Sequence, residues 1–500
     1  MKIKNLSRTI FLKPGSYILI SIIVLIFAFL CNSCSTNADK GTISGIVMLV
    51  NDSDNPSLNP VDYAGVTVAL YKTAVLDTTL VRINQQYPQI GVQITQETEF
   101  DHRNFDPIKV VTTDADGKFS FPSLSAGNYN LVLWKTDWGI RYLCSVRAEE
   151  KENNNLGTIE LYPSTSYNST IISEPTIFKS DHSYFVLTDV NFMSSVEFQP
   201  RTQIFINPAA MLKFYGAVIT PEFTSSNDMW KITSGKEIYS TAQVTMDFDS
   251  YFSTVNFYGE QVNIHSGFIR YGSSGLSTVN ISLTNISSMV LRDCGSALTI
   301  NQGCCNIEYI IISYCNGTGI TYISDVDSDD NVHITKCIIS NNIEQRGIFI
   351  EKAGSYNIDN CYFINNYYNI YIKNCDGLIN NNEFNQGYYY VFYYPNNPYR
   401  FQNEIHYNNF YATTSGLLIQ GRMNNINNNN FYGPSRFFIY ILSPSHNHSL
   451  VSNDVNATNN YWAVEDVSQY LADAEDDPIC PYHIIYLPKS SNPVKDAGIR

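Results

Sequence analysis

At 500 residues, with 44% hydrophobic and 15% charged side chains, the chain is long enough for two or three domains with a large core. Its formal net charge of −15 repels phosphate backbones and argues against nucleic acid as a partner. The 36 Tyr and 27 Phe residues, with abundant Ile and Asn, favour β-strands over helices.

The first 33 residues have the pattern of an export signal. A basic start leads into an apolar run of 14 residues, Tyr17–Leu30, which is short for a spanning helix and typical of a signal peptide. A small residue, Ser33, then precedes Cys34. This resembles a bacterial lipoprotein signal, although Cys31 stands where that family usually has Leu. The resemblance implies that Cys34 is lipidated and becomes the mature N-terminus.

We therefore expect a signal peptide over 1–33, a tether over 34–40, and export to a bacterial membrane. The resemblance favours the outer membrane, with the protein facing the periplasm or the cell surface. Two acyl chains on one Cys suffice for stable anchoring, so the membrane is an expected partner. An ordinary cleaved signal and an uncleaved anchor are the alternatives.

Residues 41–162 contain short strand patterns separated by turn residues, which is typical of a β-sandwich. Asp116-Gly117 is a strong hairpin signal within 109–124. The order G-x-I-S-G-x-V (41–47), A-G-V-T-V-x-L (64–70), T-D-A-D-G-x-F (113–119) and A-G-x-Y-x-L (126–131) resembles the carboxypeptidase-regulatory-like, transthyretin-like domain. That family is non-catalytic and serves as a spacer or adhesion module; an insertion falls at about 76–106. Asp114 and Asp116 are expected to form the turn rather than to bind calcium.

Residues 163–500 carry an internal repeat, in which an apolar residue, four others and a second apolar residue recur. The second residues of these pairs lie 21 to 27 positions apart, which matches one coil of a β-solenoid. The pairs are Ile286–Leu291, Ile307–Ile312, Ile334–Ile339, Ile358–Phe363, Ile379–Phe384, Ile405–Phe410 and Ile426–Phe431. A second apolar strand follows each pair, and its first core residues are Leu298, Ile320, Ile348, Ile370, Val391, Leu417 and Phe438.

The residue two positions before each second anchor should stack on its equivalents in neighbouring coils, since i and i+2 share a strand face. These residues are Met289, Ile310, Cys337, Cys361, Asn382, Asn408 and Asn429. Stacked Asn side chains hydrogen-bond amide to amide, so a buried Asn is satisfied. Cys294 and Cys315 should stack likewise. Because the spacing between coils exceeds that of a disulfide, we expect mostly buried free thiols.

The pattern resembles the right-handed parallel β-helix, or pectate-lyase-like, family over about 165–490. Residues 184–220 resemble its opening coils, with Arg201 where that family has Gly, and 456–462 with 474–478 resemble its closing segment. The expected fold is all-β: a small β-sandwich followed by a right-handed parallel β-helix (163–500) with a C-terminal capping segment. The family hosts lyases, hydrolases, epimerases, adhesins and inert spacers, so the resemblance fixes no activity.

The residue after each first core residue of the second strand should point outward. This row reads Thr299, Thr321, Phe349, Tyr371, Phe392, Leu418 and Ile439. It contains no acid or base, which makes it a poor floor for a lyase. Phe349, Tyr371 and Phe392 form a candidate ligand platform on which sugar rings could stack. The alternative is that residues 463–500 or the sandwich cover the row, because a long exposed apolar stripe favours aggregation.

Other motifs carry little chemistry. Asp325–Asp330 begins like a calcium loop but has Asp330 where an EF-hand needs Gly, so no cofactor is expected and Ca²⁺ is the weak alternative. His446 and His448 lack an evident third ligand. Four His and Arg residues lie singly in loops of the repeat, and the sequence pairs none of them as nucleophile and base. They are His333, His406, Arg346 and Arg422.

Three functions therefore stay open. The favoured one is a membrane-anchored, non-catalytic lipoprotein whose β-helix binds a polysaccharide or a surface protein. The second is a polysaccharide lyase, glycoside hydrolase or epimerase with a polar site in the early coils. Its candidate residues are Asp247, Asp249, Glu260, His265 and Arg270. The third is an inert spacer or adhesin.

Overall fold

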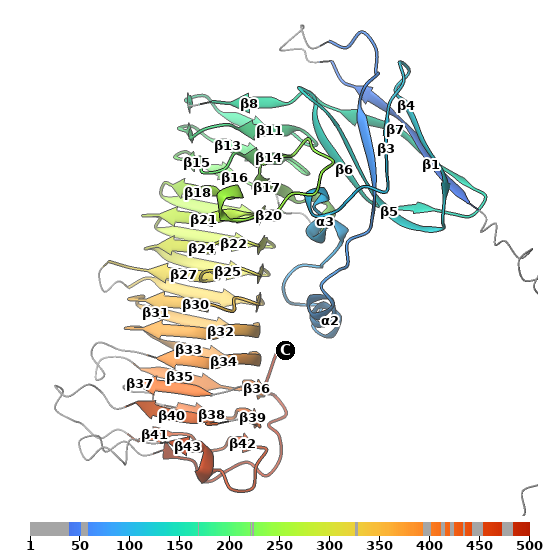
Figure 1. Cartoon of the computed structure of the whole chain (residues 1–500). Helices are drawn as coiled ribbons and strands as arrows, with labels where there is room; N and C mark the ends of the chain where they lie inside the picture. The colour runs from blue at the N-terminus through green and yellow to red at the C-terminus, as the bar shows by residue number, and fades with distance from the viewer. Residues whose placement is uncertain are drawn as a thin grey trace, which may run out of the picture.

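The structure is a computed structural model. It describes residues 40–51, 59–168, 170–220, 222, 225–325, 329–393, 402–411, 416–420, 425–433, 436–442, 454–472 and 484–500. Strands make up 52% of the chain and helices 6%, which confirms the all-β prediction. A long parallel β-solenoid fills the C-terminal region, and a smaller β-unit lies beside its first coils (Figure 1).

The N-terminal unit has two small sheets that enclose one core. The first contains β1 (Gly41–Leu49), β4 (Lys118–Leu124) and β7 (Asn153–Leu161); the second contains β2 (Thr67–Lys72), β3 (Lys109–Thr112), β5 (Gly127–Lys135) and β6 (Gly139–Ala148). Ile43, Phe121 and Leu131 are among the buried side chains between them. The arrangement is sandwich-like, as expected.

The prediction of a hairpin at Asp116-Gly117 is correct for the turn and wrong for the strand pairing. The turn forms, since the Gly117 N–H donates to the Asp114 carbonyl at 2.9 Å. However, β3 pairs with β2 whereas β4 pairs with β1, so the turn carries the chain from one sheet to the other. Turn residues specify the reversal of the chain, but the pairing depends on which core each strand faces.

Each complete coil of the solenoid adds one strand to each of three parallel sheets. The first sheet contains β8 (Thr165–Tyr167), β11 (Ser183–Val186), β14 (Gln203–Ile206), β17 (Trp230–Ser234), β20 (Gly267–Arg270), β23 (Val290–Arg292), β26 (Ile311–Ser313), β29 (Ile338–Ser340), β36 (Asn409–Tyr411), β39 (Asn430–Tyr432) and β42 (Tyr461–Trp462). The second contains β9 (Thr170–Ile172), β12 (Val190–Phe192), β15 (Met211–Phe214), β18 (Phe252–Tyr258), β21 (Gly272–Val279), β24 (Ser296–Asn301), β27 (Ile320–Ile323), β30 (Arg346–Glu351), β37 (Leu417–Gln420), β40 (Ile439–Leu442) and β43 (Leu471–Ala472). Two long strands, β32 (Tyr362–Lys373) and β34 (Glu383–Tyr393), continue through the corner and belong to both.

The third sheet closes the coil. It contains β10 (Thr176–Phe178), β13 (Val196–Phe198), β16 (Val218–Ile219), β19 (Gln261–His265), β22 (Leu283–Ser287), β25 (Cys304–Glu308), β28 (Asn331–Thr335), β31 (Ser355–Asp359), β33 (Asp376–Asn380), β35 (Asn403–His406), β38 (Asn425–Asn427), β41 (Val455–Asn456) and β44 (Ile484–Ile485). The helical segments of the described chain are short. They are α2 (Thr78–Gln86), α3 (Gln96–Glu99), η2 (His102–Asn104), η3 (Ser226–Asp228), η4 (Phe248–Ser250) and η5 (Ser468–Tyr470).

Strand pairing confirms the predicted coils. Every first anchor from Ile286 to Ile426 pairs with its equivalent in the third sheet, and every second anchor from Leu291 to Phe431 does so in the first. In the last of the seven predicted coils, the predicted core residue of the second sheet is wrong by one position. Leu417 pairs with Ile439, not with Phe438, so Ile439 lies in the core and the outward residue is Tyr440.

The corner between the third and first sheets holds the predicted amide ladder. The Asn382 side-chain amide donates to Asn408 Oδ1 at 3.0 Å, Asn408 to Asn429 at 3.0 Å, and Asn429 to Asn460 at 3.1 Å. All four side chains are buried. Each acceptor oxygen also takes a backbone N–H from the coil before, as Asn382 does from Cys361 at 2.8 Å. The ladder therefore satisfies buried backbone as well as side-chain groups.

The next corner, between the first and second sheets, has a similar stack, of which the sequence predicts only the cysteines. Cys294 and Cys315 are buried there, and Asn342 and Asn366 continue the file, with the Asn342 amide donating to Asn366 Oδ1 at 2.8 Å. The Cys315 N–H donates to Asn342 at 3.2 Å. The described cysteines are free, and most are buried, as expected.

A left-handed residue precedes each rung of the first ladder. Asn381, Tyr407, Asn428 and Asn459 have φ between 55° and 61°. This conformation turns the chain through the corner and aims the next side chain inward. Asn tolerates it better than most residues do, which explains the paired Asn residues of the sequence.

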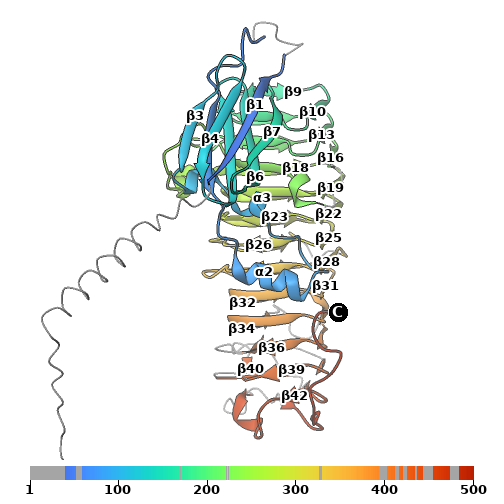
Figure 2. The ribbon, with the colours of Figure 1, turned by 90° about the vertical axis from the view of Figure 1, so that its right-hand side faces the viewer.

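Two segments cover the outer face of the first sheet. Helix α2 and the chain after it lie across the middle coils (Figure 2), where Leu80 and Ile83 pack with Ile311 and Ile338. Further along, the C-terminal tail, 494–500, binds the sheet through its backbone. The Val494 N–H, for example, donates to Asn430 Oδ1 at 2.6 Å. Insertion and tail together make this face an internal interface.

The ladder predicts a position-specific stability effect. Asn408→Ala removes the acceptor of two buried donors on Asn382 and should lower the free energy of unfolding by about 3 kcal/mol, as measured by urea titration. Asn306→Ala is the matched control, because the Asn306 amide also donates to its neighbour in the adjacent coil, at 2.8 Å, but on the exposed surface. It should change stability by less than about 0.5 kcal/mol. Equal losses in the two variants would contradict the assigned role of the buried ladder.

Candidate functional site

The predicted platform lies on the outer face of the second sheet. Phe349 in β30 pairs with Tyr371 in β32, and their ring centroids are 5.3 Å apart. The Arg346 guanidinium lies over both rings, 4.5 Å and 4.4 Å from their centroids. Phe392 pairs with Tyr371 in the next coil, but its side chain is outside the described residues. The row therefore places two of the three predicted aromatic residues together and adds the Arg346 guanidinium, for which the sequence predicts no partner.

Two further tyrosines extend this group. The rings of Tyr367 and Tyr368 are 4.7 Å apart, and Tyr368 lies 5.9 Å from Tyr371. We name Arg346, Phe349, Tyr367, Tyr368 and Tyr371 the Arg346 cluster. Phe349 is only 9% exposed, because the guanidinium covers it, so its ring is not an open stacking surface. Half-buried Tyr368 and Tyr371, exposed Tyr367 and the edge of Arg346 form the accessible part.

The Arg346 cluster combines the two features with which proteins hold polar ring molecules. Stacking on two aromatic rings fixes the guanidinium by cation–π attraction, and its N–H donors lie in a rigid plane. Across the described chain, no carboxylate forms an ion pair with Arg346. The cluster can therefore offer directed hydrogen-bond donors beside aromatic surface.

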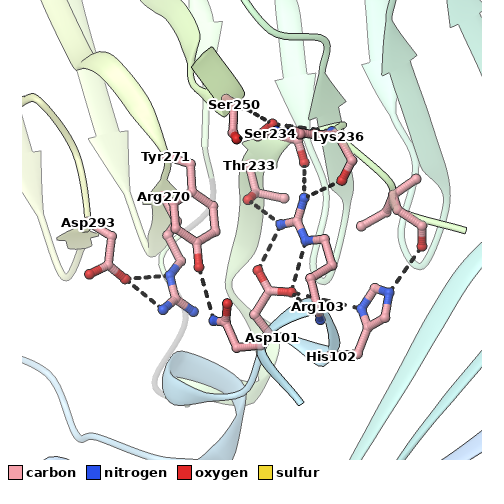
Figure 3. A network of polar contacts seen from close by, with 12 residues as sticks. Asp101, His102, Arg103, Thr233, Ser234, Lys236, Ser250, Arg270, Tyr271 and Asp293 are labelled. Carbon is pink, nitrogen blue, oxygen red and sulfur yellow. Dashed lines mark hydrogen bonds and ion pairs between the residues drawn. The ribbon is translucent and has the colours of Figure 1, made fainter. Parts of the chain in front are cut away.

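The insertion docks the N-terminal unit on the solenoid through buried ions (Figure 3). Arg103 donates to both oxygens of Asp101, at 3.0 and 2.7 Å, and to the Ser234 carbonyl at 2.6 Å. Burial alone would raise the pKa of Asp101, but the Arg103 guanidinium outweighs it and lowers that pKa below its usual range. The adjacent His102 bonds to Tyr142 at 2.8 Å. Burial lowers the pKa of His102 to about 4, so this imidazole is neutral at pH 7.

Solenoid arginines complete the docking network. Arg270 contacts Asp293 at 2.6 Å, and Arg292 forms an ion pair with Glu99 of α3. Breaking a buried pair leaves an uncompensated charge, so such networks specify one arrangement of the groups that they join. The network therefore orients the N-terminal unit against the first sheet.

The residues of the enzyme alternative do not converge on one site. Arg270 belongs to the docking network, while Asp247 accepts a 2.6 Å hydrogen bond from Ser250 at the start of η4. His265 contacts the Ser287 hydroxyl at 2.5 Å. Asp249 and Glu260 are exposed. In the parts of the chain that the structure covers, no three His, Cys, Asp or Glu side chains gather to hold a metal ion.

The remaining sequence candidates have structural roles or fall outside the described residues. Asp114 and Asp116 bind Lys118 within their turn, at 2.8 and 2.7 Å. Asp330 accepts a hydrogen bond from the Gly303 N–H at 3.0 Å, and Asp325 is exposed. The candidates outside the described residues are Cys34, Arg422, His446 and His448.

A buried carboxylate marks the junction between insertion and tail. Glu383 of β34 is 4% exposed and accepts hydrogen bonds from Asn409, at 2.7 Å, and from Tyr87 and Tyr411. The tail can approach because Gly498 lacks a side chain; a Cβ there would lie 2.3 Å from Glu383 Oε1. Burial raises the pKa of Glu383 to about 7, against the opposing effect of these hydrogen bonds.

Among the described residues, no helix has the length and apolar character needed to cross a bilayer. Comparison with protein-family models, curated proteins and solved structures finds no match to this chain.

Glu383 predicts a pH-dependent stability. The unfolded carboxyl ionises near pH 4.5 and the folded one near 7, so its stabilising contribution is complete below pH 4.5 and is lost as the pH rises through 7. The loss should be on the order of 3 kcal/mol at pH 8. Glu383→Gln should remove this dependence and raise the melting temperature at pH 8 relative to wild type. A parallel pH profile in the two proteins would contradict the assignment.

Proposed function

We propose that this chain is an exported lipoprotein that displays a parallel β-helix for binding glycans, without catalysing a reaction. In this proposal residues 1–33 are a signal peptide and Cys34 carries the lipid. The N-terminal unit is a spacer of the carboxypeptidase-regulatory-like type, and the solenoid is a right-handed, pectate-lyase-like helix. The location favoured is the outer membrane, facing the periplasm or the cell surface.

The Arg346 cluster is the observation that carries the proposed binding role. The first sheet is used internally, since the insertion and the tail pack on it. The cluster instead lies on the second sheet, with a guanidinium and three tyrosines at the surface. Aromatic faces bind the apolar faces of pyranose rings, and an unpaired planar donor can fix their hydroxyl groups.

The docked N-terminal unit supports the display role. A spacer that hung on a flexible linker would leave the solenoid free to lie in any direction relative to the anchor. Here Arg103, Arg270 and Arg292 are buried in a network that joins both units. This network would then hold the second sheet in one orientation relative to β1, the first strand after the tether.

Glycan binding can be tested with the unlipidated chain, 35–500, on an array of immobilised polysaccharides and oligosaccharides. For the strongest ligand, Arg346→Ala and Tyr371→Ala should each weaken binding at least about tenfold, or about 1.4 kcal/mol. Phe248→Ala removes an aromatic side chain that is 59% exposed elsewhere and should have no effect. Release of new sugar ends or unsaturated products from any ligand would instead favour an enzyme, and no bound glycan would favour a spacer.

The lipid anchor can be tested by feeding an alkyne-labelled fatty acid to a bacterium that expresses the full chain. Cys34→Ala should abolish labelling, because it removes the thiol that carries the diacylglyceryl group. Cys31→Ala is the matched control and should keep full labelling. Label that persists in Cys34→Ala and disappears in Cys31→Ala would move the anchor to Cys31.

A further inference from the structure

Strand β6 packs on the early coils at Ile140, whose N–H donates to Ser183 Oγ at 3.0 Å, and a cleft lined by β6, β7 and the coils lies beside this contact. Its volume is about 590 Å³, within the range of small-molecule sites, which occur preferentially between domains. Leu143, Val146 and Leu156 line one side, and Met229 and Lys231 line the solenoid side. The three residues from β6 and β7 are half-buried, so they give the cleft an apolar wall.

A smaller hollow of about 40 Å³ adjoins this cleft. That is room for a water molecule or a group of similar size. Lys231 lines both spaces, and therefore stands where they meet. The other charged groups around the hollow are Glu97, Asp101, Arg103 and Arg270, so its lining has three cations and two acids.

Lys231 is the cation without a counterion. Arg103 pairs with Asp101 at 2.7 Å and Arg270 with Asp293 at 2.6 Å. The Lys231 ammonium donates one hydrogen bond, to the backbone carbonyl of Glu97 at 2.9 Å. An ammonium has three N–H donors, and among the described residues no carboxylate forms an ion pair with this one.

The surroundings of Lys231 favour an anion. Burial lowers its pKa, with partial compensation from nearby acids, because a desolvated charge without a counterion is costly. Burial also raises the pKa of the neighbouring Cys144 thiol to about 12, so this thiol stays neutral and supplies no negative charge. An external anion would supply the missing charge.

We propose that the cleft binds a monocarboxylate with an apolar body. Its carboxylate would accept hydrogen bonds from the Lys231 ammonium at the mouth of the hollow. Its apolar part would lie against Leu143, Val146 and Leu156. A single negative charge matches the Lys231 ammonium. Of the acids in the lining, Asp181 already pairs with Arg141 and Arg201, and Glu97 acts on the Lys231 charge without forming an ion pair with it. This site is independent of the Arg346 cluster.

Calorimetric titration of the chain 35–500 with sodium decanoate at pH 7 tests the proposal. Decanoate should saturate one site per chain, and decanamide, which has the same length but no charge, should bind at least tenfold more weakly. Lys231→Met should weaken decanoate binding at least tenfold. The control Lys213→Met, which changes a lysine of β15 on the second sheet, should leave it unchanged.

A second variant keeps the lysine and fills the cleft. Val146 is half-buried in β6, and Val146→Trp should displace the apolar body and weaken decanoate binding at least tenfold in the folded variant. The proposal would be overturned if decanoate failed to saturate wild type, if decanamide bound equally well, or if Lys231→Met retained full affinity.

Discussion

The solenoid depends on stacked corner side chains that satisfy the backbone of the adjacent coil. Parallel coils lie about 4.8 Å apart, a spacing that amide groups bridge with hydrogen bonds of normal length, as Asn382, Asn408, Asn429 and Asn460 do. A slip of one residue would turn these amides outward and break the hydrogen bonds that they make to the adjacent coil. The ladder thus fixes the register on which the flat outer rows of side chains depend.

The outer rows of side chains differ in what packs on them. The row on the first sheet is apolar at Val290, Ile311 and Ile338, under the insertion, and polar at Asn409 and Asn430, where the tail binds by its backbone. The apolar stretch packs on apolar side chains of the insertion, and the polar stretch forms hydrogen bonds with the backbone of the tail. The same face receives the ionic network that positions the N-terminal unit, which leaves the second sheet for the Arg346 cluster and creates the interdomain cleft beside Lys231.

The coils were predictable because one apolar pattern recurs seven times, and each anchor confirms the others. The error at Phe438 arose where Phe437, Phe438 and Ile439 are all apolar, so the pattern has no period to set the register. Docking of the insertion could not be predicted, because Arg103 and Arg270 lie 167 residues apart in sequence and neither belongs to a motif. The sequence does contain one signal of this packing. The outward residues of the first sheet change from apolar to polar after Tyr362, where the cover changes from the insertion to the tail.

The register of the coils can be measured directly by pulsed electron spin resonance between two nitroxide labels. Asn306 and Asn425 occupy the same outward row of the third sheet, five strands apart. In a background that lacks the half-exposed Cys144 and Cys304, labels at these positions should give one narrow distance distribution centred near 24 Å, or about five spacings of 4.8 Å. A broad distribution, or a centre displaced by two or more spacings, would contradict the stacked arrangement.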